Sequence, residues 1–145
     1  MVTWGKFRDK RSGKVFFLFN THFDHMGKIA RQKSADLLTQ KVNEIASAVP
    51  AVISGDFNSE PDSIAYQSIT ASLDDSRPQS ATPPRGPEGT SRDFDLDSVP
   101  QKRIDYIFVN QGVSVQEFAV LDDTYGKGRR PSDHMPVLAV VAIPD

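Results

Sequence analysis

The sequence predicts an α+β fold with a mixed, mostly antiparallel β-sheet and helices on one of its faces. Two observations carry this prediction. Apolar residues recur at helical spacing from about residue 28 to residue 49, between two short apolar runs at 15–19 and 51–54. This strand–helix–strand order indicates a βαβ unit, whose strands can be parallel. Further short apolar runs, bounded by Gly, Pro and polar residues, predict additional strands.

The first third of the chain predicts two strands and a long helix. Residues 2–8 alternate as in a strand, and the polar segment 9–14 predicts a hairpin connection. The run 15–19 is uniformly apolar, which is typical of a central strand covered on both faces. The helix ends before Pro50. Its predicted core-facing stripe consists of Ala30, Leu37, Leu38, Val42, Ile45 and Val49.

The rest of the chain alternates short ordered segments with one long irregular segment. Residues 61–70 predict a short helix with Pro61 in its first turn. Residues 71–103 contain five prolines among Ser, Gly and Asp, and loops of this length in small domains are usually functional or mobile. Strands are predicted at 51–54, 104–109, 113–121 and 137–143, the last of them a buried closing strand. The whole chain, 1–145, is expected to form one domain.

Composition excludes several classes of protein. The 145 residues are 38% hydrophobic and 25% charged, as in one soluble globular domain. The net charge of −2 argues against tight non-specific nucleic-acid binding, although not against a nuclease with a local basic rim. The absence of cysteine excludes disulfides and thiolate metal sites. The sequence contains no apolar run of membrane-span length and no secretory signal, so the compartment is unknown and cytoplasmic by default.

A polar motif, Gly55-Asp56-Phe57-Asn58-Ser59-Glu60-Pro61, directly follows the apolar run at 51–53. If the strand continues through it, Asp56 and Asn58 project to the same side at its carboxyl end, where open α/β sheets bind ligands. Such a pair can hold a hard cation, or a water molecule beside a phosphate. The alternative is a helix-entry turn in which Asn58 or Ser59 caps the following helix. The motif alone leaves the two interpretations evenly matched.

Three further polar clusters lie at the ends or starts of predicted strands: His22, Asp105, and Asp133 with His134. Each has an ordinary explanation, since His22 can close a strand, Asp105 can pair with Arg103, and Asp133 can form an Asx-turn. The chain has only three histidines, however, and two of them stand at strand mouths beside acidic partners. The combination favours a catalytic interpretation.

Four segments together resemble the endonuclease/exonuclease/phosphatase superfamily. They are Asn20-Thr21-His22, Gly55-Asp56-Phe57-Asn58, Arg103-Ile104-Asp105-Tyr106-Ile107-Phe108 and Ser132-Asp133-His134-Met135-Pro136-Val137. The resemblance extends over nearly the whole chain. It implies a metal-dependent hydrolase of phosphate esters, usually using magnesium, with a phosphomonoester, a phosphodiester or a nucleic acid as substrate.

The resemblance also implies a role for each matching residue. His134, oriented by Asp105, would contact a phosphate oxygen, and His22 would be a second phosphate contact. Asp56 would position or deprotonate the attacking water, and Asn58 would contact the phosphate or hold Asp56. Asp133 would belong to the metal shell. The expected catalytic residues are His22, Asp56, Asn58, Asp105 and His134, and the expected metal ligands are Asp133, Asp56 and Asn58. Oxygen ligands of this kind suit Mg²⁺ or Mn²⁺ better than zinc.

The resemblance further implies that the chain corresponds to the C-terminal half of the family's fold. Complete members carry an upstream strand with an asparagine and a glutamate metal ligand, which this chain does not match. We therefore expect half of an α–β sandwich, with the second sheet absent or supplied by a partner. The exposed sheet face would then pair two copies as a homodimer. The alternative functions are a weak or inactive half-domain that acts as a binding or complementation module, and a nuclease acting on DNA or RNA.

Overall fold

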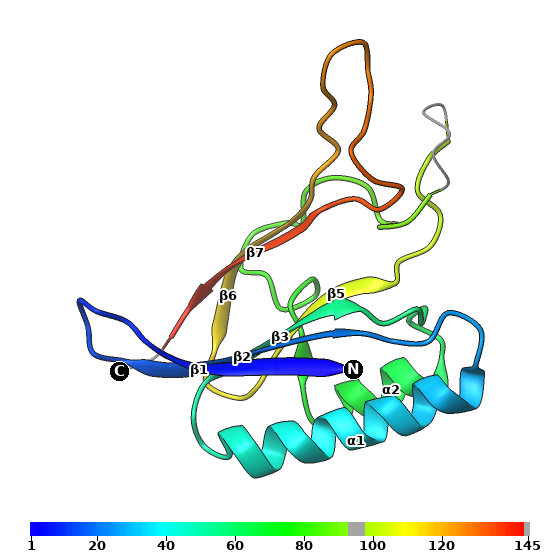
Figure 1. Ribbon diagram of the computed structural model, residues 1–145. Coiled ribbons are helices and arrows are strands. Elements are labelled where there is room, and N and C mark those ends of the chain that lie inside the picture. The colour runs from blue at the N-terminus through cyan, green and yellow to red at the C-terminus, as the bar shows by residue number, and fades with distance from the viewer. Residues whose placement is uncertain (93–97, 144–145) are drawn as a thin grey trace.

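The computed structural model describes residues 1–92 and 98–143, which form two helices and seven strands (Figure 1). In chain order they are β1 (Val2–Arg8), β2 (Val15–His22), α1 (Lys28–Ala46), β3 (Ala51–Asp56), α2 (Ile64–Thr70), β4 (Asp74–Asp75), β5 (Asp105–Val109), β6 (Ser114–Val120) and β7 (Val137–Ala142). Every strand and helix that the sequence predicts is present. The predicted bounds differ at the end of the long helix, at the start of the short helix, and at the ends of β2 and β3, which extend beyond the predicted 19 and 54.

The main sheet has five strands in the order β1-β2-β3-β5-β4. β2 and β3 are parallel, which confirms the strand–helix–strand unit, and the other three pairs are antiparallel. The predicted fold class, a mixed and mostly antiparallel sheet with helices on one face, is confirmed. The register also has a functional consequence: His22 is paired with Asp56, and Asp56 is paired with Asp105. Three candidate site residues therefore stand side by side across the sheet.

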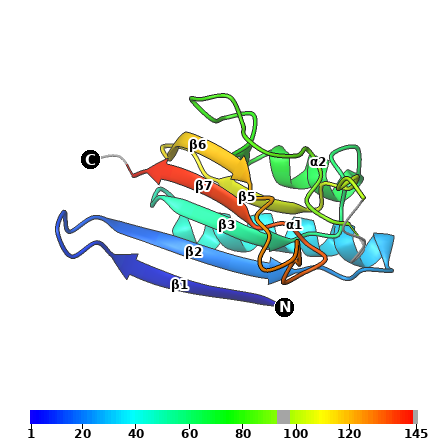
Figure 2. The same ribbon diagram turned by 90° about the horizontal axis from the view of Figure 1, so that it is seen from above.

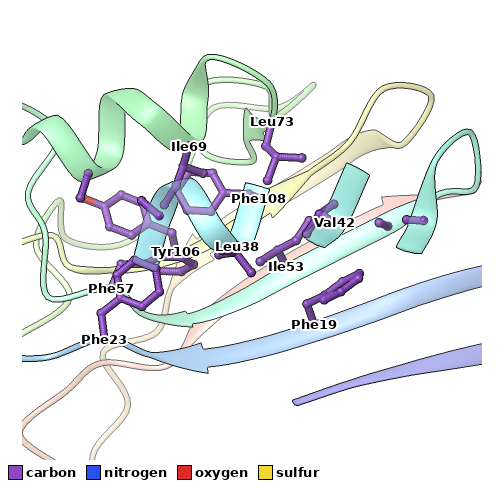
Figure 3. Close-up of a cluster of buried hydrophobic side chains, with 14 of the residues drawn as sticks. Phe19, Phe23, Leu38, Val42, Ile53, Phe57, Ile69, Leu73, Tyr106 and Phe108 are labelled. Carbon is purple, nitrogen blue, oxygen red and sulfur yellow. The ribbon is translucent and has the colours of Figure 1, made fainter. Parts of the chain in front are cut away.

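Both helices cover the same face of the main sheet (Figure 1), and the hydrophobic core lies between the helices and the sheet (Figure 3). Phe19, Ile53 and Phe108 come from three neighbouring strands and are completely buried. Leu38 and Val42 of α1 lie opposite them, as the predicted stripe requires, and Ile69 of α2 completes this layer. The stripe is wrong at two of its members, because Ala30 is exposed and Leu37 is 55% exposed.

The apolar run at 15–19 is not covered on both faces. Phe17 and Phe19 point toward the helices and are buried, whereas Leu18 points to the opposite face and is 38% exposed. Successive side chains of a strand point to opposite faces, and the second face of β2 has no covering layer among the described residues. The prediction of a doubly covered strand is therefore wrong for this chain.

A small second sheet consists of β6 and β7 (Figure 1). Seen from above, it lies over the β3–β5 side of the main sheet, and β1 and β2 extend beyond it (Figure 2). Its own buried cluster contains Phe118, Val120 and Met135. β7 is not the buried closing strand that the sequence predicts, because Leu138 and Val140 are 39% and 44% exposed. The chain itself thus supplies part of a second sheet, and β7 is half-exposed because the described residues cover only one of its sides.

The short helix begins later than predicted. Ser63 is its N-cap, with Oγ accepting a hydrogen bond from Tyr66 N at 3.2 Å, and Pro61 lies in the preceding turn. Neither Asn58 nor Ser59 caps α2. The irregular segment 71–103 contains the two-residue strand β4, and its residues 93–97 lie outside the described part of the chain. Within the described part, neither helix is long and apolar enough to cross a membrane.

Candidate active site

The motif 55–61, which begins in the last two residues of β3, depends on a glycine that no other residue can replace without rearrangement. A Cβ atom on Gly55 would lie 2.0 Å from the carbonyl oxygen of Thr21 on the neighbouring strand β2. That distance is far inside van der Waals contact, so only glycine allows the two strands to approach here. This close approach brings the ends of β2 and β3, with His22 and Asp56, next to each other.

Asp56 and Asn58 meet through a turn rather than along an extended strand. β3 ends at Asp56, and Asn58 has a φ of 48°, a left-handed conformation that asparagine tolerates better than most residues. The backbone N–H of Asn58 donates to Asp56 Oδ1 at 2.8 Å, and Asn58 Nδ2 lies 3.3 Å from Asp56 Oδ2. Asn58 Nδ2 also donates to the carbonyl of Phe23 at 3.1 Å. Asn58 thus orients the Asp56 carboxylate and ties it to the segment after β2.

His22 and Asp56 form the first of two histidine–carboxylate contacts. His22 Nε2 lies 3.2 Å from Asp56 Oδ2. The His22 side chain is 72% exposed, whereas that of Asp56 is 17% exposed. The imidazole is therefore free to contact a ligand from solvent while its partner carboxylate is held in the wall of the site.

His134 and Asp105 form the second contact. His134 Nδ1 lies 2.8 Å from Asp105 Oδ2, and the same oxygen accepts a hydrogen bond from Thr90 Oγ1 at 2.7 Å. Burial raises the pKa of Asp105, although the hydrogen bond from Thr90 and the charge of His134 act in the opposite direction. Burial alone would lower the pKa of His134, but the carboxylate of Asp105, together with those of Asp56 and Asp133, raises it, and the net shift of this pKa is upward. His134 therefore retains its proton to higher pH than an ordinary histidine.

All the residues expected in the site line one open hollow of about 520 Å³. They are His22, Asp56, Asn58, Asp105, Asp133 and His134, and His25 joins them. Asp24, beside His25, lies at the start of the long helix, where Oδ1 accepts hydrogen bonds from the backbone of Met26, at 2.8 Å, and of Gly27. The hollow thus combines three acidic side chains, one carboxamide and three imidazoles, on segments from four parts of the chain.

Thr90 and Ser91 are the residues of this region that sequence reasoning missed. Thr90 is fully buried against Asp105, and Ser91 Oγ lies 3.4 Å from His134 Nε2. Both belong to the irregular segment 71–103, where hydrophobic periodicity gives no guide to position. The pattern of the sequence carries no signal that would have selected these two hydroxyls from the other Ser and Thr residues around them.

The donor set fits a hard divalent cation. Carboxylate oxygens of Asp56 and Asp105 and a ring nitrogen of His134 lie within 4.8 Å of one another. Asp105 Oδ2 and His134 Nδ1 are hydrogen-bonded to each other, and Asp133 and Asn58 line the same hollow as Asp56. Oxygen donors of this kind are what Mg²⁺ and Mn²⁺ prefer, and water would complete the coordination shell.

Comparison with solved structures shows where this architecture recurs. A functionally unknown conserved protein from Enterococcus faecalis V583 is 31% identical, with a TM-score of 0.89 over 97% of this chain and 55% of that one. A mannosyl-6-phosphatase from Bacteroides thetaiotaomicron VPI-5482 is 36% identical, with a TM-score of 0.89 over 98% of this chain and 57% of that one. A family protein from Bacteroides vulgatus is 37% identical, with a TM-score of 0.87 over 98% and 55%. The chain thus spans little more than half the length of these proteins.

Comparison with curated proteins by sequence gives no match. The model of the endonuclease/exonuclease/phosphatase family, in contrast, matches residues 2–134, which include the first three segments on which the resemblance rests and residues 132–134 of the fourth. The family match covers most of the chain, and the solved structures agree with it in fold at more than 30% identity. The chain therefore belongs to the endonuclease/exonuclease/phosphatase family.

Proposed function

We propose that this chain carries the phosphate-binding and water-activating residues of a metal-dependent phosphoester hydrolase. The observation that carries the proposal is the arrangement of two imidazoles around one carboxylate-lined hollow. His134 is held by Asp105 at 2.8 Å, and His22 lies 3.2 Å from Asp56. A tetrahedral phosphoryl group placed in this hollow would meet the positive charge of the imidazoles and, on its other side, a carboxylate that can act as a base.

The residues divide the chemistry between them. Asp56, which is oriented by Asn58, accepts a proton from the attacking water as the water oxygen bonds to phosphorus. His134 and His22 donate hydrogen bonds to the phosphoryl oxygens, on which negative charge increases in the transition state. Asp105 keeps the His134 ring in place and favours its charged form. The bond from phosphorus to the leaving oxygen breaks, and that oxygen leaves with a proton from solvent.

A divalent cation has a defined place in this proposal. Asp56, Asp133 and the carboxamide oxygen of Asn58 are the residues that would hold Mg²⁺ or Mn²⁺. The ion would supply positive charge against the phosphoryl oxygens and lower the cost of bringing a charged substrate to a carboxylate-lined site.

The substrate is proposed to be a phosphomonoester, with sugar 6-phosphates the first to test. A mannosyl-6-phosphatase is 36% identical over 98% of this chain, which favours a terminal phosphate on a small polar molecule. The net charge of −2 agrees with a small substrate rather than a long polyanion. A diester or a nucleic acid would require further basic contacts along the backbone of the substrate.

The decisive experiment is a substrate panel with and without chelator. Mannose 6-phosphate, p-nitrophenyl phosphate, bis-p-nitrophenyl phosphate and single-stranded DNA are incubated with the protein, with Mg²⁺ or with EDTA. We expect release of phosphate from the monoesters, loss of that activity in EDTA, and its loss in Asp56→Asn and His134→Gln. Activity that is indifferent to both EDTA and Asp133→Ala would contradict the proposed chemistry. Asp62→Asn, at an exposed position outside the hollow, is the control variant.

A second candidate, an association module, is favoured by the uncovered face of the main sheet. Phe7 stacks on Phe16 with ring centroids 5.5 Å apart, and Leu18 follows on the same face of β2. We propose that this face pairs two copies of the chain as a homodimer, because exposed apolar patches mark association sites. Light scattering at micromolar concentration is expected to give twice the chain mass, and Leu18→Glu is expected to halve it. A monomer in both proteins would exclude the homodimer.

A further inference from the structure

We propose that Thr90 is a positioning residue for the Asp105–His134 pair and that segment 90–92 holds both members in register. The proposal concerns a residue that neither the family resemblance nor the sequence motifs assign. Thr90 is completely buried, and its hydroxyl lies among polar groups of the candidate site rather than among apolar side chains. Burial of a hydroxyl at such a position requires that its hydrogen bonds be made within the protein.

The hydrogen bonds of Thr90 fix the direction of its single proton. Its Oγ1 accepts from the backbone N–H groups of Ile104, at 3.1 Å, and of Asp105, at 3.0 Å. A hydroxyl has two acceptor positions and one proton, so two N–H donors leave only that proton free to donate. Asp105 Oδ2 lies 2.7 Å from Oγ1, closer than the 3.5 Å to the carbonyl of Lys102. The proton therefore points to the Asp105 carboxylate.

The same carboxylate oxygen is the partner of His134. Asp105 Oδ2 accepts both from Thr90 Oγ1 and from His134 Nδ1, so one oxygen joins the hydroxyl and the imidazole. With Nδ1 donating to the carboxylate, Nε2 is the ring nitrogen left to face a ligand. The Thr90 hydroxyl thus limits rotation of the Asp105 side chain, and through it the orientation of His134 Nε2.

The backbone around Thr90 restrains the other end of the pair. The carbonyl of Thr90 accepts from the N–H of Met135 at 2.7 Å, and the N–H of Arg92 donates to the carbonyl of Asp133 at 2.9 Å. These two bonds flank His134 on either side, and Ser91 forms a bridge with His134 between them. Segment 90–92 consequently contacts the start of β5 through the Thr90 hydroxyl and the His134 segment through its backbone. It joins two parts of the chain that meet only in the folded structure.

Two substitutions separate the hydroxyl from the rest of the Thr90 side chain. Thr90→Val keeps the shape but removes the proton donor and leaves two backbone N–H groups without their acceptor, whereas Thr90→Ser keeps the hydroxyl and loses a methyl group. Because the activity readout rests on the proposed function, the primary readout is the NMR signal of the His134 Nδ1 proton, which needs no turnover. The chain has three histidines, so the assignment is tractable.

We expect the His134 Nδ1 proton to exchange slowly and to show a cross-relaxation peak with the Thr90 hydroxyl proton in the unmodified protein, because both protons bond to the same oxygen. In Thr90→Val the Nδ1 signal broadens or disappears, and in Thr90→Ser it remains. If the chain hydrolyses phosphomonoesters, kcat falls about 10- to 100-fold in Thr90→Val with KM unchanged, as for other residues that orient an active-site histidine. Thr90→Ser recovers most of that loss.

Two controls distinguish positioning from stability. Thr82→Val removes a hydroxyl from the same segment, where it donates to the carbonyl of Gln116 at 3.3 Å, and is expected to leave both readouts unchanged. Ile69→Val weakens the core away from the site and reports the effect of lower stability alone. The inference is overturned if the unmodified protein lacks the cross-relaxation peak, if Thr90→Val retains the Nδ1 signal, or if Thr90→Ser loses as much as Thr90→Val. If the NMR results are as expected but the unmodified protein has no phosphatase activity, the proposed function is contradicted and the inference about Thr90 is not.

Discussion

Asp74 and Asp75 are adjacent in the short strand β4, yet their removal should have very different effects. Asp75 is 4% exposed, and its Oδ2 is paired with the Arg103 guanidinium and accepts from Tyr66 Oη at 2.8 Å. The Arg103 side chain is only 10% exposed and lies 4.7 Å from the centre of the Tyr106 ring. Asp74 is exposed, and Gln79 Nε2 donates to its Oδ1 at 3.4 Å.

Asp75→Ala would leave the Arg103 charge buried without its partner. Breaking a buried pair in this way costs about 3–5 kcal/mol, a large part of the roughly 5–15 kcal/mol by which domains of this size are stable. With a urea m-value of about 2 kcal/mol per molar, the unfolding midpoint should fall by about 2 M. Asp74→Ala should change the free energy of unfolding by less than about 0.5 kcal/mol.

The assay is urea unfolding followed by circular dichroism, with Trp4 fluorescence as a second probe of the same transition. Both probes should report one transition if the chain unfolds cooperatively. The reasoning would be refuted by equal midpoints for the two variants, or by a larger loss in Asp74→Ala. A double variant, Asp75→Ala with Arg103→Met, should recover much of the stability, because the uncompensated charge is then absent.

Three further outcomes are expected. Asp105→Asn removes the carboxylate that raises the pKa of His134, so this pKa should fall; NMR titration of the histidine ring protons measures it, and an unchanged pKa would mean that Asp105 is not the cause. Burial and the bond to Asp75 raise the pKa of Tyr66 to about 12, so the unfolded state loses this proton first and stability should fall as pH rises from about 10 to 12. Urea midpoints at pH 9 and 11 measure that fall, and it should be smaller in Tyr66→Phe; an equal fall in both proteins would place the effect elsewhere. Gly55→Ala would put a methyl group 2.0 Å from the Thr21 carbonyl oxygen, so it should lower both the unfolding midpoint and any phosphatase activity. Gly13→Ala, in an open turn, should leave the activity unchanged. Normal stability in Gly55→Ala would show that the strands can separate without cost.

Much of this fold could be predicted from local patterns. The helical spacing of α1 and the apolar run of β3 each reflect side chains that face one shared core, so periodicity located them. Alternation also located β1, although most of its side chains are exposed. Whether a second layer of the protein covers the other face of a strand could not be predicted in the same way. The run at 15–19 is apolar on both faces, but only packing decides whether a second layer covers the face that carries Leu18. The same is true of β7.

The candidate site divides along a similar line. The residues of the site could be identified from the sequence, because several histidines and carboxylates at strand ends are an unusual combination. The residues by themselves left open whether Asp105 pairs with Arg103 or with His134, and only the family resemblance implied His134. The structure places Arg103 against Asp75 and Asp105 against His134. The choice depends on the antiparallel register of β3 and β5 and on the path of segment 71–103, which brings Thr90 beside Asp105.

By itself the sequence determined every strand and helix except β4, the family that the motifs resemble, and the side chains that can bind a phosphate or a cation, because these depend on local periodicity and residue chemistry. Only the tertiary structure decided that His22, Asp56 and Asp105 stand in one row across the sheet and that Asn58 orients Asp56 through a left-handed turn. It also decided that Thr90 and His134 hydrogen-bond the same oxygen, Oδ2 of Asp105. Apart from the Asn58–Asp56 turn, these features join residues far apart in the chain. Strand register and the packing of an irregular segment fix such contacts, and neither leaves a periodic trace in the sequence.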